Sequence, residues 1–272
     1  MDLHTVTVLH RPADRAELAG RLGPGAAPLA GGTWMFSQPQ LHLHTLVDLT
    51  GLGWPALRVT DAGLEIAATC TLAELAAFAA PPGWPAAALA RSCCEALAGS
   101  FKIWHTATVG GNICLGLPAG PMTSLAAALD GELELWPASG PARRVPVTEF
   151  VRGDRRTALR PGEVLRAVHL PVAALVARTA FRRAALATQG RSGAVVIGRR
   201  DPAGGFVLTV TAATDRPRRL AFARLPTAAE LATELDRIET WFDDPHGAPD
   251  WRRAVTLLLA DQIRADLRAE LA

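Results

Sequence analysis

Residues 106–118 read TATVGGNICLGLP, in which two adjacent glycines and an asparagine follow a short β-branched run. A second glycine pair lies far upstream, in PLAGGTWMF at residues 28–36. Glycine adopts positive φ and lets a ligand approach bare backbone N–H groups. Successive N–H groups in such a turn form a nest that suits phosphate. The two pairs therefore predict two glycine-rich turns, from two lobes, that grip one diphosphate.

One glycine pair alone is typical of a tight turn. Here a small polar side chain, Thr33 or Asn112, follows each pair, and this favours a dinucleotide ligand. The chain has no G-x-G-x-x-G segment after a strand, no G-x-x-x-x-G-K-[ST] segment and no G-x-S-x-G segment. The residues by themselves therefore predict a dinucleotide site that is not of the Rossmann type.

The composition narrows the class of protein. The 272 residues are 49% hydrophobic and 20% charged, which is an ordinary globular composition. With 28 basic and 26 acidic residues, the charge balance gives no field of the kind that implies nucleic acid as a partner. The arginine clusters are typical of solvated loops and helix faces. They lie at 143–144, 152–156, 182–183 and 216–219.

No stretch reaches the roughly 18 uninterrupted apolar residues that a membrane span requires. The N-terminal residues lack a basic segment followed by an apolar core, so we expect no signal peptide and a cytoplasmic protein.

His42 and His44 alternate on an expected strand, but no third metal ligand is evident. The cysteines match no zinc or iron–sulfur spacing and are expected to be buried free thiols. They stand at positions 70, 93, 94 and 114.

The pattern of apolar residues predicts an α+β fold with a separate C-terminal lobe. Capping boxes at Thr71–Glu74 and Thr227–Glu230 predict two helix starts. Strands are expected at 5–9, 26–30 and 45–48, in hairpins at 57–70 and 131–147, at 164–171, and in three segments between 181 and 214. Helices are expected at 14–22, 72–79, 86–98, 122–129 and 249–269, and the chain after the last of these strands is expected to be helical.

Several of these segments together resemble one family, the FAD-binding medium subunit of molybdenum hydroxylases of the xanthine dehydrogenase and carbon monoxide dehydrogenase type. AGGTWMF is similar to that family's AGGT-D-L loop, and TVGGNICLGLPAGP to its T-[IV]-GGN-(x)-SPAAD segment. GEVLRAVHLP resembles the strand that leaves the FAD domain, and FRRAALATQGRSGAVVIG the opening of the C-terminal domain. The resemblance covers nearly the whole chain.

The resemblance implies a fold and a domain division. Residues 1–173 are expected to form a two-subdomain FAD-binding domain of the vanillyl-alcohol-oxidase/PCMH-like type. Its subdomains would span about 1–53 and 54–173, with the dinucleotide extended in the cleft between them. Residues 178–272 are expected to form a smaller α+β domain, an antiparallel sheet plus helices.

The resemblance also implies a binding site. Leu165 falls near where family members pack the isoalloxazine ring. Arg182 or Arg183 falls where the family places a lysine near the flavin, and a cation there would stabilise an anionic reduced flavin. The remaining expected FAD-binding residues lie in the two glycine segments, and the pyrophosphate would be held through backbone N–H groups, Thr33, Thr108 and Asn112. These residues are Pro28, Leu29, Ala30, Gly31, Gly32, Thr33, Trp34, Met35, Thr108, Gly110, Gly111 and Asn112.

The sequence departs from the family at several positions. Trp34 and Pro121 replace two carboxylates that accept from sugar hydroxyls, and Ser192 replaces a further frequent Asp. Trp104-His105 replaces the usual Arg-Asn pair. The chain has no tyrosine, so Trp34, Trp104 or Phe101 would have to supply any aromatic contact with the flavin.

The function implied by the resemblance is electron transfer. A large molybdopterin-binding subunit would oxidise the organic substrate, and a small subunit with [2Fe-2S] clusters would pass electrons to the FAD of this chain. NAD+ or another acceptor would take them, in a dimer of heterotrimers. Two alternatives remain: a stand-alone flavin oxidoreductase, and a non-catalytic scaffold subunit whose flavin binding is weakened or lost. No residue of this chain is expected to be catalytic.

Overall fold

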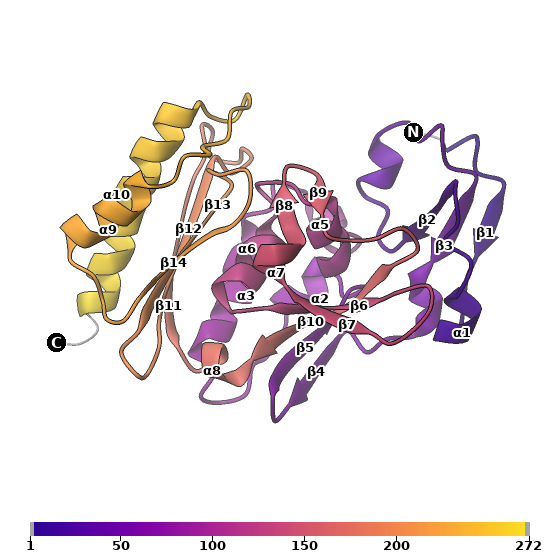
Figure 1. The fold of residues 1–272 in the computed structure, drawn as a ribbon, viewed down its shortest axis with the longest axis horizontal. Coiled ribbons are helices and arrows are strands. Elements are labelled where there is room, and N and C mark those ends of the chain that lie inside the picture. Colours follow the sequence, from indigo (N-terminus) through magenta and orange to yellow (C-terminus); the bar gives the residue numbers. More distant parts are fainter. Residues whose placement is uncertain (1–2, 270–272) are drawn as a thin grey trace.

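The computed structural model describes residues 3–269, which are arranged around three main sheets in a row (Figure 1). The first sheet is parallel, in the order β1-β3-β2, and carries the N-terminal lobe at one end of the molecule. Its strands are β1 (Val8–His10), β2 (Ala26–Leu29) and β3 (Thr45–Asp48), and the short helix α1 (Arg15–Leu18) follows β1.

The second sheet is antiparallel and occupies the middle of the molecule, in the order β4-β5-β10-β6-β7. Leu133 and Leu135 of β6 point into the main core, while Glu132 and Glu134 lie on the other face. The strands are β4 (Leu57–Thr60), β5 (Gly63–Ala67), β6 (Glu132–Trp136), β7 (Arg143–Pro146) and β10 (Val164–Pro171). The helices of this core are α2 (Leu72–Ala76), α3 (Leu89–Glu95), α5 (Val109–Leu115) and α6 (Pro121–Ala128).

The third sheet forms the C-terminal lobe, in the order β11-β12-β13-β14 with antiparallel pairing. One face packs on the long helix α10, and the other face meets α6 of the middle layer. Successive side chains of β12 therefore enter different cores: Val196 packs in the core under α10, and Val195 packs in the main core. The elements are β11 (Arg178–Ala184), β12 (Ala194–Arg200), β13 (Phe206–Thr211), β14 (Arg218–Phe222), α9 (Ala228–Asp236) and α10 (Pro249–Ala269).

Shorter elements connect these layers. The two-stranded ribbon β8–β9 follows the hairpin β6–β7, and its turn is bonded to the end of α5. The bounds are η1 (Met35–Ser37), η2 (Leu49–Leu52), η3 (Pro85–Ala88), α4 (Phe101–Trp104), α7 (Val147–Phe150), β8 (Val151–Gly153), β9 (Arg156–Thr157) and α8 (Val172–Leu175).

The α+β class is confirmed, and so are several local expectations. The side chains of Thr71 and Thr227 each accept a hydrogen bond from the backbone N–H of the glutamate three residues on. The side chain of that glutamate accepts one from the backbone N–H of the threonine, so both capping boxes are present. The long C-terminal helix spans Pro249–Ala269 as expected. The thiols are free, and burial raises the pKa of Cys70 to about 12.

Three expectations were wrong in detail. The segment Val109–Leu115, expected as a glycine turn, is helix α5. The strand Arg218–Phe222, within a stretch expected to be helical, is the edge strand β14. The helix expected at 14–22 covers only Arg15–Leu18, because Ala19 is extended and Gly20 has a φ of 76°.

Within residues 3–269, no helix is both long and apolar enough to cross a bilayer. In the same part of the chain, no group of three or more His, Cys, Asp or Glu side chains is placed to hold a metal ion.

Candidate FAD-binding site

The first glycine segment leaves β2 and leads into η1 with its backbone amides unengaged. Gly32 has a φ of 67°, a left-handed conformation that glycine adopts without strain. Among the described residues, no acceptor takes a hydrogen bond from the amides of Gly31, Gly32, Thr33 or Trp34. Successive free N–H groups of this kind bind an anion. This loop therefore has the donors that a diphosphate requires.

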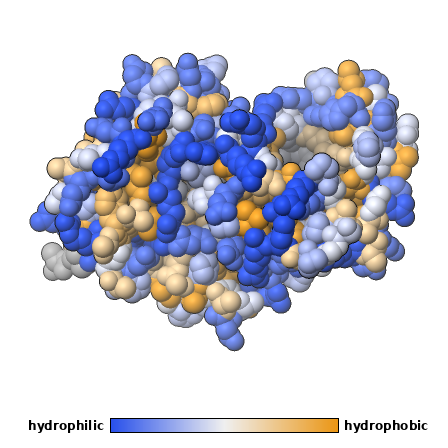
Figure 2. All heavy atoms as spheres, in the orientation of Figure 1, coloured by the Kyte–Doolittle hydropathy of each residue, from blue (hydrophilic) through white to orange (hydrophobic). Residues whose placement is uncertain are grey.

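The two glycine segments, far apart in sequence, lie against each other in space. A β-carbon on Gly31 would lie 1.8 Å from the carbonyl oxygen of Thr106 and 3.2 Å from the Cα of Ala107. Only glycine permits this approach of one backbone to another. Figure 2 shows the surface hollowed between the lobe of β1–β3 and the rest of the molecule.

The second glycine segment does not form the expected nest of free amides. Val109 donates its N–H to the carbonyl of Cys70 (2.8 Å), and Gly110 donates to the carbonyl of Ala68 (2.9 Å). Gly111 donates to the hydroxyl of Thr108 (3.1 Å), which caps helix α5. The fold itself takes up the donors that the sequence pattern assigned to phosphate.

Side chains of the second segment remain available to a ligand. Asn112 accepts a bond from the N–H of Met122 through its side-chain oxygen (3.0 Å), which fixes the direction of its amide group. In the described part of the chain, the side-chain nitrogen of Asn112 has no acceptor. Gly111 is exposed, and a β-carbon there would meet only the Thr108 hydroxyl, at 2.9 Å.

Leu165 does not reach the surface. Its side chain is 2% exposed and lies in the main core, on a strand position paired with Leu135 of β6. The expected contact of Leu165 with a flavin ring stays a prediction. The bulge in β10 between Leu165 and Ala167 turns Arg166 toward the outer face of the sheet, next to Glu65.

Arg182 and Arg183 occupy opposite faces of β11. Arg182 forms an ion pair with Asp266 of α10 and therefore points away from the main core. Arg183 pairs in register with Val195, on the side of the main core, and donates to the carbonyl of Gly190 (2.6 Å). Its buried Nε has no partner among residues 3–269. Of the two arginines, only Arg183 is directed toward the FAD-binding part of the chain.

The departures from the family pattern have definite places. Pro121 is buried as the first residue of α6. The Ser192 hydroxyl is buried and has no partner among the described residues. Trp104 packs partly against the main core, whereas Phe101 is 72% exposed. Trp34 lies under the guanidinium of Arg155, whose carbon is 5.0 Å from the centroid of the indole ring.

Sequence reasoning missed Arg155 because it read the cluster at 152–156 as a solvated loop. Arg155 occupies the β8–β9 turn with a φ of 52°, and its N–H donates to the carbonyl of Gly116 (2.9 Å). The only signal in the sequence was the cluster itself, and that signal does not say which arginine turns toward Trp34.

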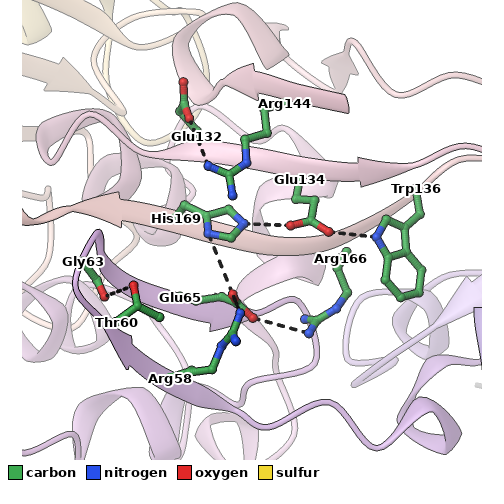
Figure 3. Close-up of polar contacts among 10 residues, drawn as sticks. All are labelled: Arg58, Thr60, Gly63, Glu65, Glu132, Glu134, Trp136, Arg144, Arg166 and His169. Atoms are coloured by element: carbon green, nitrogen blue, oxygen red, sulfur yellow. Dashed lines mark hydrogen bonds and ion pairs between the residues drawn. The ribbon is translucent and has the colours of Figure 1, made fainter. Parts of the chain in front are cut away.

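A second arginine–tryptophan stack joins the N-terminal lobe to the middle sheet. Arg15 of α1 lies 5.0 Å over the ring of Trp136, and Arg166 lies 4.6 Å over Trp54. Figure 3 shows how Trp136 is held, because its indole N–H donates to Glu134 (2.9 Å), which also bonds His169 (2.9 Å). Bonds to Trp136 and His169 lower the pKa of Glu134, although burial opposes the shift. This network fixes the junction of the two lobes.

Residues 5–173 match the family described as the FAD binding domain in molybdopterin dehydrogenase. This range is more than half of the chain, so the chain belongs to that family. The membership confirms the resemblance to the medium subunits of molybdenum hydroxylases, which are flavoprotein parts of oxidoreductases, and FAD is the cofactor of the matched domain.

Curated relatives and solved structures agree with this assignment. The chain is 30% identical over 169 residues to the carbon monoxide dehydrogenase medium chain of Afipia carboxidovorans, which is 60% of this chain and 58% of that one. It is 31% identical over 121 residues to a xanthine dehydrogenase of Oryza sativa subsp. japonica, 42% of this chain and 9% of that protein. The matched part is thus less than two thirds of either relative.

Several solved structures share the fold. Quinoline 2-oxidoreductase from Pseudomonas putida 86 superposes with a TM-score of 0.81 at 19% identity, over 98% of this chain and 98% of that one. Reconstituted CO dehydrogenase from Oligotropha carboxidovorans gives 0.80 at 22% identity, over 94% and 97%. Identities this low establish the shared fold alone.

The residues of this chain fit FAD best at its diphosphate. The free amides of the first loop and the side-chain nitrogen of Asn112 are hydrogen-bond donors that suit phosphate oxygens. The fit is weaker at the sugar hydroxyls, because Trp34 and Pro121 supply no carboxylate acceptor. The backbone donors are unaffected by these departures, since they depend on glycine rather than on side chains.

Proposed function

We propose that this chain is the FAD-carrying electron-transfer subunit of a molybdopterin-dependent hydroxylase or dehydrogenase. The observation that carries the proposal is the row of four unengaged amides at Gly31–Trp34, set directly against the second glycine segment. A large subunit with molybdopterin oxidises the organic substrate, and a small subunit with [2Fe-2S] clusters relays the electrons to this chain.

FAD, when bound, supplies the redox centre that collects these electrons and delivers them to NAD+ or another acceptor. The residues of this chain bind and orient it and do no acid–base chemistry. The loop from Pro28 to Met35 holds the diphosphate through its amides, and Thr33, Thr108 and Asn112 add side-chain contacts. Arg183 supplies the cation for the reduced flavin, since Arg182 is committed to Asp266.

The proposed assembly is a dimer of heterotrimers. The proposed division of the chain places the cofactor between residues 1–53 and 54–173 and leaves 178–272 as the C-terminal domain. The parallel sheet, the middle sheet and the C-terminal sheet each fall within one of these three segments.

The first test is an absorbance spectrum of the purified protein, together with any partners that copurify, followed by release and quantification of the chromophore. We expect flavin bands near roughly 370 and 450 nm and about one FAD per chain. A colourless chain that stays colourless after incubation with FAD contradicts the proposal. It would favour a scaffold subunit whose site Trp34 and Pro121 have disabled.

The second test is Gly111→Val, which adds a branched side chain to the exposed start of α5. The Thr108 hydroxyl must shift, because a β-carbon there would lie 2.9 Å from it, but no backbone atom is close and the fold should persist. The flavin content should fall, because the side chain occupies the surface proposed to face FAD. Gly23→Val is the matched control, since a β-carbon at Gly23 has no neighbour within 4 Å. Normal flavin occupancy in Gly111→Val would show that FAD does not lie against α5.

A further inference from the structure

Two arginine–tryptophan stacks connect the N-terminal lobe with the rest of the FAD domain, and they are built differently. In one, Arg15 donates to the carbonyl of Gly140 (2.8 Å), and Trp136 donates to Glu134 (2.9 Å). Each member of this stack is therefore held by a second hydrogen-bond partner.

The other stack, Trp34 with Arg155, has no such support. Within residues 3–269, the Arg155 guanidinium forms no ion pair or hydrogen bond, and the Trp34 indole N–H has no acceptor. The two groups hold only each other, at 5.0 Å from guanidinium carbon to ring centroid. Opening this contact therefore breaks no hydrogen bond or ion pair of either side chain among the described residues.

The two residues of this stack lie on opposite sides of the proposed FAD-binding site. Trp34 directly follows Thr33 at the end of the row of free amides. Arg155 lies on the turn between β8 and β9, which is bonded to the carbonyl of Gly116 at the end of α5. The stack thus joins the loop proposed to hold the diphosphate to the opposite lobe of the domain.

We propose that the Trp34–Arg155 stack is a clasp that closes over bound FAD and slows its release. The inference rests on the proposed function, because it takes FAD as the occupant of the groove between the lobes. Trp34 stands where the family pattern has a carboxylate that accepts hydrogen bonds from sugar hydroxyls. In this chain an aromatic ring, which a cation can cover, takes the place of that acceptor. Arg155 and Trp34 are then retention residues and take no part in electron transfer.

The expected effect is modest. An exposed cation–π pair is a weak interaction, so loss of the clasp should raise the dissociation rate constant of FAD about two- to five-fold. The association rate constant should not fall, because the stack is closed in the structure and has to open before the cofactor enters. Loss of either partner should remove the whole effect.

The test measures FAD release from the full-length protein, or from its complex, by the fluorescence of flavin freed after dilution. The variants are Arg155→Ala, Trp34→Leu and the double variant, with Trp34→Phe as a variant that keeps an aromatic face. Arg156→Ala is the matched control, because the Arg156 guanidinium lies against Gly153 rather than Trp34. Thermal denaturation of each variant shows that it folds.

We expect Arg155→Ala, Trp34→Leu and the double variant to release FAD at one common, raised rate, and Trp34→Phe to release it at an intermediate rate. Arg156→Ala should match the wild type. Wild-type release from Arg155→Ala, or single effects that add in the double variant, would overturn the clasp while leaving the proposed function intact. A wild-type protein that binds no FAD would overturn both.

Discussion

Gly110 of α5 lies directly on Ala68 at the end of β5. A β-carbon on Gly110 would come within 2.5 Å of the Ala68 side chain and within 2.8 Å of its Cα and carbonyl oxygen. The first glycine of the second pair is therefore required for helix-on-strand packing, whereas the second, Gly111, faces open space apart from Thr108.

This difference predicts opposite outcomes for two neighbouring substitutions. Gly110→Ala should destabilise the protein by about 1–3 kcal/mol, because the added methyl group collides with backbone that cannot move freely. Gly111→Ala should stay within about 1 kcal/mol of the wild type, since alanine also suits a helix better than glycine does. Urea denaturation measures both, and equal losses would show that the close contact with Ala68 does not govern this helix.

Gly31→Ala tests the contact between the two glycine segments. The β-carbon would overlap the carbonyl oxygen of Thr106 at 1.8 Å, so the first loop must shift away from Thr106 and Ala107. We expect at least a tenfold loss of FAD affinity, measured by flavin titration of the apoprotein. Gly23→Ala, whose β-carbon would have no neighbour within 4 Å, should bind as the wild type does. Unchanged affinity in Gly31→Ala would mean that the loop position is not needed for binding.

Arg252 anchors the C-terminal lobe from within. It is 1% exposed, pairs with Asp244, and donates to the carbonyls of Gly193, Ala212 and Gly247. Burial lowers the pKa of Arg252, and Asp244 opposes the shift. Arg252→Met leaves these acceptors unpaired and should cost about 3–5 kcal/mol in urea denaturation.

Arg253→Ala is the matched control for Arg252→Met. Its ion pair with Asp236 is about half exposed on both sides, so the loss should be below about 1 kcal/mol. Similar losses in the two variants would show that the buried arginine is replaceable.

The pair Glu163–Arg143 predicts a dependence of stability on pH. The Arg143 side chain donates to Glu163 at 2.6 and 2.8 Å, and this bonding lowers the Glu163 pKa below its ordinary 4.5. A lowered pKa in the folded state contributes stability above the ordinary pKa that is lost as pH falls through the folded value. Glu163→Gln should therefore be less stable than the wild type at neutral pH by about 1–3 kcal/mol.

The difference between wild type and Glu163→Gln should shrink as pH falls below 4.5. Arg143→Met should show the same narrowing, because it removes the other half of the pair. Denaturation midpoints measured from about pH 7 to about pH 3 check this. A gap that stays constant over this range would assign the stability to packing instead of the charge pair.

Much of the fold was predictable because its signals are local. The capping boxes at Thr71 and Thr227 and the apolar periodicity of Pro249–Ala269 each act over a few residues. The strand Arg218–Phe222 was missed because an edge strand with two arginines has little apolar alternation, and only pairing with β13 makes it a strand.

The proximity of the two glycine segments was predictable, but the engagement of their backbone donors was not. The two glycine segments were identified as one site, and the structure brings Gly31 and Thr106 together. In the first segment the amides are free, whereas in the second they donate to the carbonyls of Ala68 and Cys70. The sequence did not reveal this difference, because each segment is a glycine pair followed by a polar residue. Nor did it separate Arg183 from Arg182, whose faces depend on register with β12.

The sequence by itself determined the order of elements, the two glycine segments and their resemblance to a flavoprotein family, because helix caps, turns and glycine requirements are properties of neighbouring residues. Only the tertiary structure decided which amides are free, that Leu165 is buried, and that Arg155 covers Trp34. These features depend on contacts between residues far apart in the chain, such as Val109 with Cys70 and Arg155 with Trp34. There, packing and hydrogen-bond partners, rather than local preference, select the outcome.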